Sequence, residues 1–291
     1  MIGRFILALI KESNVMNIQN ILCTFACIIT LQTQTEQYQL RQIGPLFCFG
    51  QNILDKGSIR LREVPYYFKN SEHTLSYTST QAFYALSNNW IIWMGFPTKL
   101  KNKGFNTTGR LIATRIESEY AYHHIVTSEK RILVSILGNC IIPTKFTTNN
   151  SPIPYNDTGG LSCYLATTAG HLTPAWYIYG STGVQINPSY HAKKFGNLYR
   201  YEWIIGKGIP TGSWNTYIMC EFSGIHLQKS RCFDVHDPNS GGNIIYVGSS
   251  IISRSDHFYI WAGMQGAVLQ GLHGNQQQPT LRASCMVAVL F

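Results

Sequence analysis

Short apolar runs separated by turn-forming residues recur along the whole chain, and they constrain its fold more than any other feature. Examples are WIIWMGF (90–96), RILVSILGN (131–139), AWYIYGS (175–181) and HFYIWAGMQG (257–266). Aromatic and β-branched residues favour pleated, half-buried surfaces, whereas Gly, Asn and Ser favour turns. No segment combines a helix cap with three turns of helical apolar periodicity. The chain is therefore expected to be all-β.

Charge and motif content limit the function. Charged residues make up 13% of the chain, about half the usual share of roughly 25%. The formal net charge is +9, but the basic residues are scattered, and Lys99, Lys101 and Lys103 form the only tight group. No recognition helix, zinc finger or RNA-binding motif accompanies them, so a nucleic-acid partner is not expected. Nucleophile-elbow and phosphate-loop motifs are missing too, which favours a binding protein over an enzyme.

The N-terminal region resembles an export signal. Residues 21–31, ILCTFACIITL, form an apolar run of signal-peptide length, and polar residues follow at once. We expect residues 1–35 to be a leader, with Met16 as the natural start; a buried N-terminal strand is the alternative. No later run reaches eighteen apolar residues, so no membrane span is expected.

The cysteines agree with export. Loss of the leader leaves six cysteines, and an even number suits disulfides in a periplasmic or extracellular protein. They are Cys48, Cys140, Cys163, Cys220, Cys232 and Cys285. Fifteen pairings are possible, and the sequence does not choose among them. Our preferred pair is Cys140–Cys163, which would close a loop of polar, Pro-rich and Gly-rich chain.

The turn-rich stretch 145–160 divides the strand-like runs into two groups. We interpret them as two β domains, residues 36–168 and 169–291; one large sandwich is the alternative. The chain ends on LRASCMVAVLF (281–291), a strand without a polar tail. Its alternate residues share one face: Ala283, Cys285, Val287, Val289 and Phe291. Such a strand is either the buried last strand of a sandwich or a strand that an assembly partner handles.

The terminal strand, the leader and the stretch Trp90–Pro97 together resemble the tip adhesins of bacterial chaperone–usher fimbriae, especially the mannose-resistant Proteus-like (MR/P) family. The resemblance implies two β-sandwich domains, a receptor-binding domain followed by an incomplete Ig-like pilin domain that lacks one strand. It implies a periplasmic chaperone, an usher and an adjacent fimbrial subunit as partners, and a place at the fimbrial tip on the cell surface. Many fimbrial subunits have an aromatic residue and a Gly where this chain has Leu290 and Gln278.

The resemblance also implies a ligand site. Tip adhesins of this kind bind zinc through three histidines, and the matching region contains His73, His123 and His124, without a His-x-His motif. For a glycan receptor, aromatic faces and amide groups are the expected contacts. The candidates are Trp90, Asn88, Asn89, Tyr120 and Tyr122. Core packing is the alternative fate of these aromatic residues, because Trp90 and Trp93 lie on opposite faces of a regular strand.

A second interpretation is a secreted immunoglobulin-like glycoprotein of eukaryotic or viral origin. Cys163, Trp176 and Cys220 have roughly the spacing of an immunoglobulin core. Glycosylation triplets begin at Asn106, Asn149 and Asn156. The disulfide distinguishes the two interpretations, since the immunoglobulin case requires Cys163–Cys220. We adopt the fimbrial adhesin as the expected function.

Overall fold

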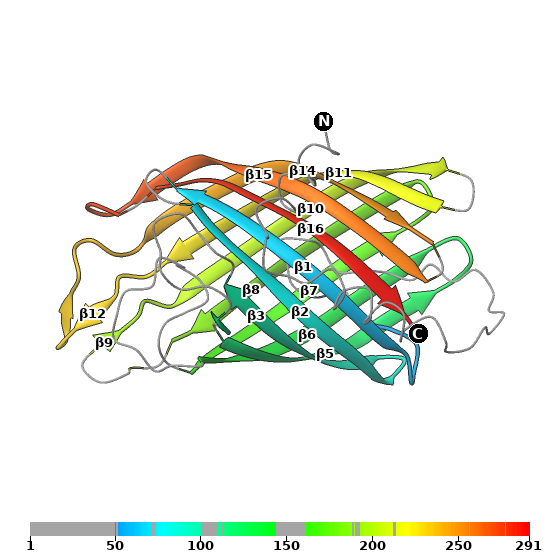
Figure 1. Ribbon diagram of the computed structural model, residues 1–291, viewed down its shortest axis with the longest axis horizontal. Coiled ribbons are helices and arrows are strands. Elements are labelled where there is room, and N and C mark those ends of the chain that lie inside the picture. The colour runs from blue at the N-terminus through cyan, green and yellow to red at the C-terminus, as the bar shows by residue number, and fades with distance from the viewer. Residues whose placement is uncertain are drawn as a thin grey trace.

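A single closed sheet forms the body of the protein (Figure 1). The computed structural model describes residues 50, 52–70, 74–99, 110–111, 113–143, 161–187, 189, 193–211, 214–255, 257–276 and 278–291. Among these, no helix is long and apolar enough to cross a bilayer. The expected leader, residues 1–35, lies outside the described residues.

Twelve long strands make up the sheet. They are β1 (Ile59–Asn70), β2 (Thr74–Ser87), β3 (Trp90–Lys99), β5 (Ala113–Val126), β6 (Arg131–Pro143), β7 (Ser162–Leu172), β8 (Trp176–Ile186), β10 (Leu198–Thr211), β11 (Trp214–Leu227), β14 (Gly242–Arg254), β15 (Phe258–Leu272) and β16 (Pro279–Leu290). The two-residue β4 (Arg110–Leu111) extends the sheet beside β3. Three further short strands form a separate small sheet: β9 (Lys193–Lys194), β12 (Arg231–Cys232) and β13 (Val235–His236).

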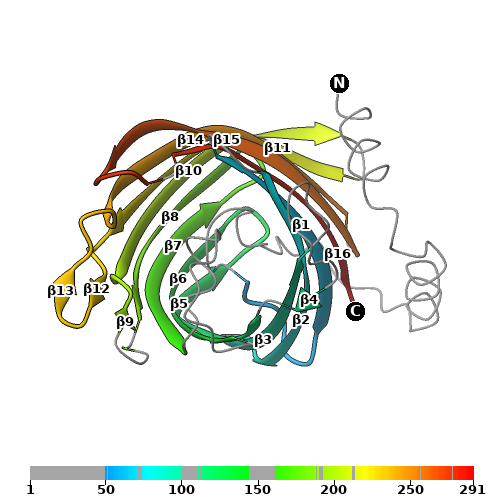
Figure 2. The same ribbon diagram turned by 60° about the vertical axis from the view of Figure 1, so that its left-hand side comes forward.

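The long strands form an up-and-down meander that closes on itself. Each strand pairs antiparallel with the next along the chain, and the last strand, β16, pairs with the first, β1. At the seam Arg60 lies opposite Leu290, and the Phe291 amide donates to the Ile59 carbonyl at 2.9 Å. Figure 2 shows the strands as a ring around a central lumen. A closed sheet has no free edge.

This closure overturns the expected fold class. The all-β prediction is confirmed, but the two β-sandwich domains, receptor-binding and pilin-like, are wrong, because one sheet runs through the expected boundary at residue 168, inside β7. The incomplete pilin domain is wrong as well. Ala283, Cys285, Val287 and Val289 share a face of β16, as predicted. However, β16 is hydrogen-bonded to β1 on one side and β15 on the other, so it needs no donated strand.

The two ends of the barrel differ in the length of their connections. At one end, the short-turn end, the links are residues 88–89, 127–130, 173–175, 212–213 and 255–257, and β1 begins and β16 ends there. At the other end, the long-loop end, the connections between β6 and β7 and between β11 and β14 are residues 144–161 and 228–241. Short turns at one end and longer loops at the other are typical of membrane-spanning barrels.

The polarity of the wall is inverted relative to a soluble protein. On β10, Trp203 faces outward with 62% of its surface exposed, while its neighbour Glu202 faces the lumen at 2%. Leu165 of β7 and Ile218 of β11 also face outward, whereas Thr168 and Glu221 of the same strands face inward. Because side chains alternate along a strand, one alternating sequence coats the barrel with apolar groups and lines much of the lumen with polar ones.

The expectation of no membrane span is therefore wrong for this fold. It rested on the lack of a long apolar run, which is the requirement for a helix. A barrel strand crosses a bilayer with about 9–11 residues, of which only alternate ones are apolar. The long strands here have 10 to 15 residues, enough for that crossing.

A charged residue on the outer face tests this orientation. We expect Ile205→Lys, in the middle of β10, to lower the free energy of unfolding in lipid by about 2–4 kcal/mol, because the ammonium group would lie at the bilayer midplane. The matched control is Ile209→Lys, on the same face near the short-turn end, where about 0–1 kcal/mol is expected. Denaturant titration in vesicles measures both. Equal losses at the two positions would contradict a bilayer around the strands.

Candidate functional site: the barrel lumen

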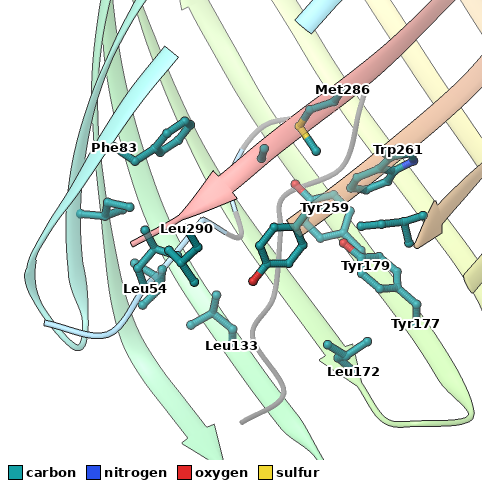
Figure 3. Close-up of a cluster of buried hydrophobic side chains, with 14 of the residues drawn as sticks. Leu54, Phe83, Leu133, Leu172, Tyr177, Tyr179, Tyr259, Trp261, Met286 and Leu290 are labelled. Atoms are coloured by element: carbon teal, nitrogen blue, oxygen red, sulfur yellow. The ribbon is translucent and has the colours of Figure 1, made fainter. Parts of the chain in front are cut away.

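An apolar cluster fills the lumen near the short-turn end (Figure 3). Side chains from around the ring contribute to it, including Phe83, Leu133, Leu172, Tyr177, Tyr179, Tyr259, Trp261, Met286 and Leu290. Most of these residues lie within a few positions of the strand end at this side of the barrel. The apolar cluster therefore narrows the lumen at one end.

The segment before β1 enters this cluster from inside the barrel. We call residues 50 and 52–58 the inner segment. Its Ile53 and Leu54 are 0% and 5% exposed and belong to the apolar cluster. A Cβ on Gly50 would approach Leu137 of β6 and Thr168 of β7, which lie nearly across the ring from β1. The inner segment therefore crosses the lumen (Figure 2).

Polar contacts fix the inner segment to the wall. The Asn52 amide donates to Glu119 Oε2 at 3.0 Å, and Arg131 Nη2 donates to the Ile53 carbonyl at 2.9 Å. Nearer β1, the Lys56 amide donates to Asn88 Oδ1 at 2.8 Å and the Gly57 amide to the Ala85 carbonyl at 2.9 Å. The hydrogen bonds of Asn52 and Ile53 satisfy backbone groups that would otherwise be buried without partners.

Hydrogen-bonded polar groups line the lumen beyond the apolar cluster. Glu119 Oε1 accepts from Ser135 Oγ at 2.5 Å, and Ser135 in turn contacts Thr168 at 2.7 Å. Across the barrel, Glu221 accepts from Gln265 Nε2 at 2.8 Å and from Ser250. The two groups come from different sets of strands, so polar side chains occupy both sides of the lumen.

Positive charge prevails on this lining. Within the described long strands, seven arginines and four glutamates face the lumen, a surplus of three positive charges. The arginines are Arg60, Arg62, Arg115, Arg131, Arg200, Arg254 and Arg282, and the glutamates are Glu117, Glu119, Glu202 and Glu221. A pathway lined by one sign of charge attracts ions of the other. The lining therefore favours anions.

The predicted receptor-binding residues lie on the outside, at the short-turn end. Trp90 and Tyr120 are cross-strand neighbours on the outer face, and Tyr122 is exposed close by. Trp90 Nε1 donates to Ser118 Oγ at 2.8 Å. Outward Tyr84, Trp176 and Phe258 occupy the same end of other strands. Aromatic residues at this level form the interfacial girdle of a membrane barrel.

Asn88 and Asn89 form the turn between β2 and β3. Asn88 holds the inner segment through Lys56, and Asn89 Oδ1 lies 3.1 Å from His124 Nδ1. The structure thus brings the five predicted residues together at one end of the barrel, where their described contacts are structural.

The predicted zinc ligands are not brought together. His73 lies outside the described residues. His124 pairs with inward-facing Leu133, while its neighbour His123 pairs with Val134 on the opposite face. Among the described residues no group of three or more His, Cys, Asp or Glu side chains could hold a metal ion. Zinc binding by this chain stays a prediction.

The preferred cysteine pair is adjacent. Cys140 of β6 lies directly opposite Cys163 of β7, with the two sulfur atoms 3.6 Å apart on the outer face. This exceeds a disulfide bond length of about 2.05 Å, so the pairing stays a prediction. The immunoglobulin pairing requires Cys163 to reach Cys220 of β11, but β8 and β10 lie between them in the sheet.

Sequence reasoning missed the residues that line the lumen. Glu202 in YRYEWIIG and Glu221 in YIMCEF are charged residues in the middle of apolar strands. A charged residue between outward-facing apolar neighbours in such segments is the signal of a polar lumen.

Comparison with known proteins agrees with the lumen-bearing architecture. No protein-family model matches the chain, and no curated protein matches it. Among solved structures it is similar to the COG4313 outer membrane channel from Pseudomonas putida F1, with a TM-score of 0.64 and 8% identity, covering 82% of this chain and 97% of that one. The NanC porin aligns with a TM-score of 0.49 and 12% identity over 79% and 98% of the two chains, too weakly to carry an argument.

The fold is that of an outer membrane β-barrel. This finding supports an exported, outer-membrane location. It overturns the fimbrial tip adhesin and its chaperone, usher and fimbrial partners, together with the glycan receptor and the immunoglobulin-like alternative. At 8% identity the similarity establishes the fold alone, so function must be argued from the lumen.

Gly50 offers a test of the inner segment. Gly50 and Gly57 both have positive φ, at +86° and +83°, but a Cβ would meet Thr168 Cγ2 at 2.5 Å only at Gly50, while nothing lies within 4 Å at Gly57. We expect Gly50→Ala to reduce the free energy that holds the inner segment in the barrel by about 1–3 kcal/mol more than Gly57→Ala does. Both substitutions strain the backbone, but only an alanine at position 50 also clashes with β7. Limited proteolysis between residues 50 and 58 measures the loosening. Equal cleavage rates would contradict the packing of Gly50 against β7.

Proposed function

We propose that this protein is an outer membrane channel that passes small solutes through its lumen, without a catalytic step. The observation that carries the proposal is the inverted polarity of a closed barrel, with Trp203 and Ile205 outside and Glu202 and Arg200 inside. An apolar coat requires a bilayer, and a charged, hydrogen-bonded lining suits a solute pathway.

The proposal includes an orientation and a resting state. Short turns normally face the periplasm, so the short-turn end would lie there and the long-loop end outside. The inner segment and the apolar cluster would close the periplasmic end. Release of Ile53 and Leu54 from the apolar cluster would open it.

Ion conductance across a planar bilayer tests the proposal. The folded full-length protein is expected to give rare openings in KCl, and a salt gradient should produce a reversal potential of the sign for anion preference. Replacement of Arg200 and Arg282 by Gln should reduce that preference, since both face the lumen. The proposal fails if neither the wild type nor a variant with a destabilised inner segment conducts.

A further inference from the structure

We propose that Arg60 and Arg62 form a binding site for organic monocarboxylates, and that Asn52 of the inner segment occupies this site in the closed barrel. The inference rests on the proposed channel function and adds its ligand class and its gate. Three observations support it: the convergence of two guanidinium groups, the lack of a carboxylate hydrogen-bonded to either of them in the described contacts, and the apolar walls around them.

The two guanidinium groups converge on one oxygen atom. Arg60 and Arg62 are successive lumen-facing residues of β1. Arg60 Nη2 donates to Asn52 Oδ1 at 2.7 Å, and Arg62 Nη1 donates to the same oxygen at 3.4 Å. Both groups also lie against the Phe83 ring, with their Cζ atoms 4.2 and 4.5 Å from its centroid.

No carboxylate accepts a hydrogen bond from either group in the contacts that the structure describes. Arg62 Nε donates to the Gln81 side-chain carbonyl, and Arg62 Nη1 lies 3.9 Å from Met286 Sδ. Arg60 is 0% exposed, and its Nε and Nη1 are buried without a hydrogen-bond partner among the described residues. A buried cation is stabilised when an anion pairs with it and satisfies its donors. The site is therefore built for an anionic oxygen, and a neutral amide now occupies part of it.

Asn52 links this site to the inner segment, which acts as the gate of the proposed channel. Its amide is held by Glu119, and the next carbonyl, that of Ile53, is held by Arg131. A carboxylate carries a full negative charge and two acceptor oxygen atoms, so it can pair with both guanidinium groups, whereas the amide of Asn52 offers them one neutral oxygen. A carboxylate should therefore displace Asn52 Oδ1 and favour release of the inner segment, because it binds the open state better than the closed one.

The residues around the site favour a ligand whose remaining part is apolar. The Phe83 ring stacks on the Trp93 ring at a centroid distance of 5.3 Å, and Arg62 Cζ lies 5.9 Å from Trp93. Phe83, Trp93 and Met286 all belong to the apolar cluster. Cationic donors beside an apolar wall fit a molecule with one carboxylate and an aromatic or aliphatic body, such as benzoate.

Benzoate and its neutral isostere benzamide test the site in the full-length protein. Calorimetry on the folded protein in detergent should detect benzoate but not benzamide, and benzoate should raise the open probability in planar bilayers. Asn52→Asp should weaken benzoate binding at least tenfold, because the new carboxylate would pair with Arg60 and Arg62. Asn52→Ala should strengthen binding, because the competing oxygen is gone.

Arginine variants complete the test. Arg60→Gln combined with Arg62→Gln should abolish the benzoate effect, while the control Arg231→Gln should preserve it, since Arg231 lies in the small separate sheet of β9, β12 and β13 and not on the lumen wall. Heat-modifiable gel migration establishes that each variant is folded. If benzoate and benzamide bind alike, or if Asn52→Asp binds benzoate as the wild type does, the site is wrong. If benzoate binds as expected but no variant conducts, the site stands and the channel function fails.

Discussion

Truncation of the chain after Gln278 is expected to abolish the folded barrel. The deletion removes β16, which pairs with both β1 and β15, and so leaves eleven strands with two open edges. In a bilayer each unpaired backbone group at such an edge costs several kcal/mol, because no water is present to replace its partner. The truncated protein should lose heat-modifiable migration and become fully sensitive to protease after addition to vesicles.

A matched change outside the barrel serves as its control. Replacement of residues 231–236 by a Gly-Ser linker of equal length removes β12 and β13, which pair only with each other and with β9. This variant should keep the migration and protease resistance of the wild type. A protease-resistant barrel without β16 would show that closure through β1 is unnecessary.

Combined replacement of Ile53 and Leu54 by Ala is expected to open the lumen. Both side chains are buried in the apolar cluster, and each truncation should cost the closed state about 2–5 kcal/mol. A loss of about 3 kcal/mol changes an equilibrium constant more than a hundredfold, so the open probability in planar bilayers should rise steeply. Alanine is preferable to an acidic residue here, because Arg60 and Arg131 would pair with a new carboxylate near the inner segment.

Lys56→Ala is the control for this variant. Lys56 is exposed, and its described hydrogen bond uses the backbone amide rather than the side chain. The conductance of the Lys56→Ala variant should equal that of the wild type. An unchanged open probability in the Ile53 and Leu54 variant, with the barrel folded, would contradict closure of the lumen by the inner segment.

The strands themselves were predictable from the sequence. The runs 90–96 and 131–139 lie within β3 and β6, and the common face of Ala283, Cys285 and Val287 on β16 follows from a period of two. Local alternation determines where strands lie and which residues share a face. It does not determine which face of the sheet meets water, because the same alternation of apolar and polar residues occurs in a soluble sandwich and in a membrane barrel.

The environment of each face follows from long-range pairing. The contact between Arg60 and Leu290 closes the ring, and no local pattern marks two residues so far apart as partners. The sequence predicts Trp90 and Tyr120 as ligand contacts because amphipathic rings suit a sugar face and a membrane interface equally well. Glu202 and Glu221 are charged and are each flanked by outward-facing apolar residues. This pattern indicates that the inner face of the sheet is the polar one.

The even number of strands in the ring has a topological consequence. A chain that crosses a bilayer an even number of times returns to the side from which it started, so Ser58 and Phe291 would share one compartment. The inner segment could then leave the apolar cluster and return to it without any polar group passing through lipid. A protease-cleavable tag joined to Phe291 should therefore be cut only by protease added to the side of the membrane on which the inner segment moves. Cleavage of this tag thus reports the orientation of the protein in each gating experiment.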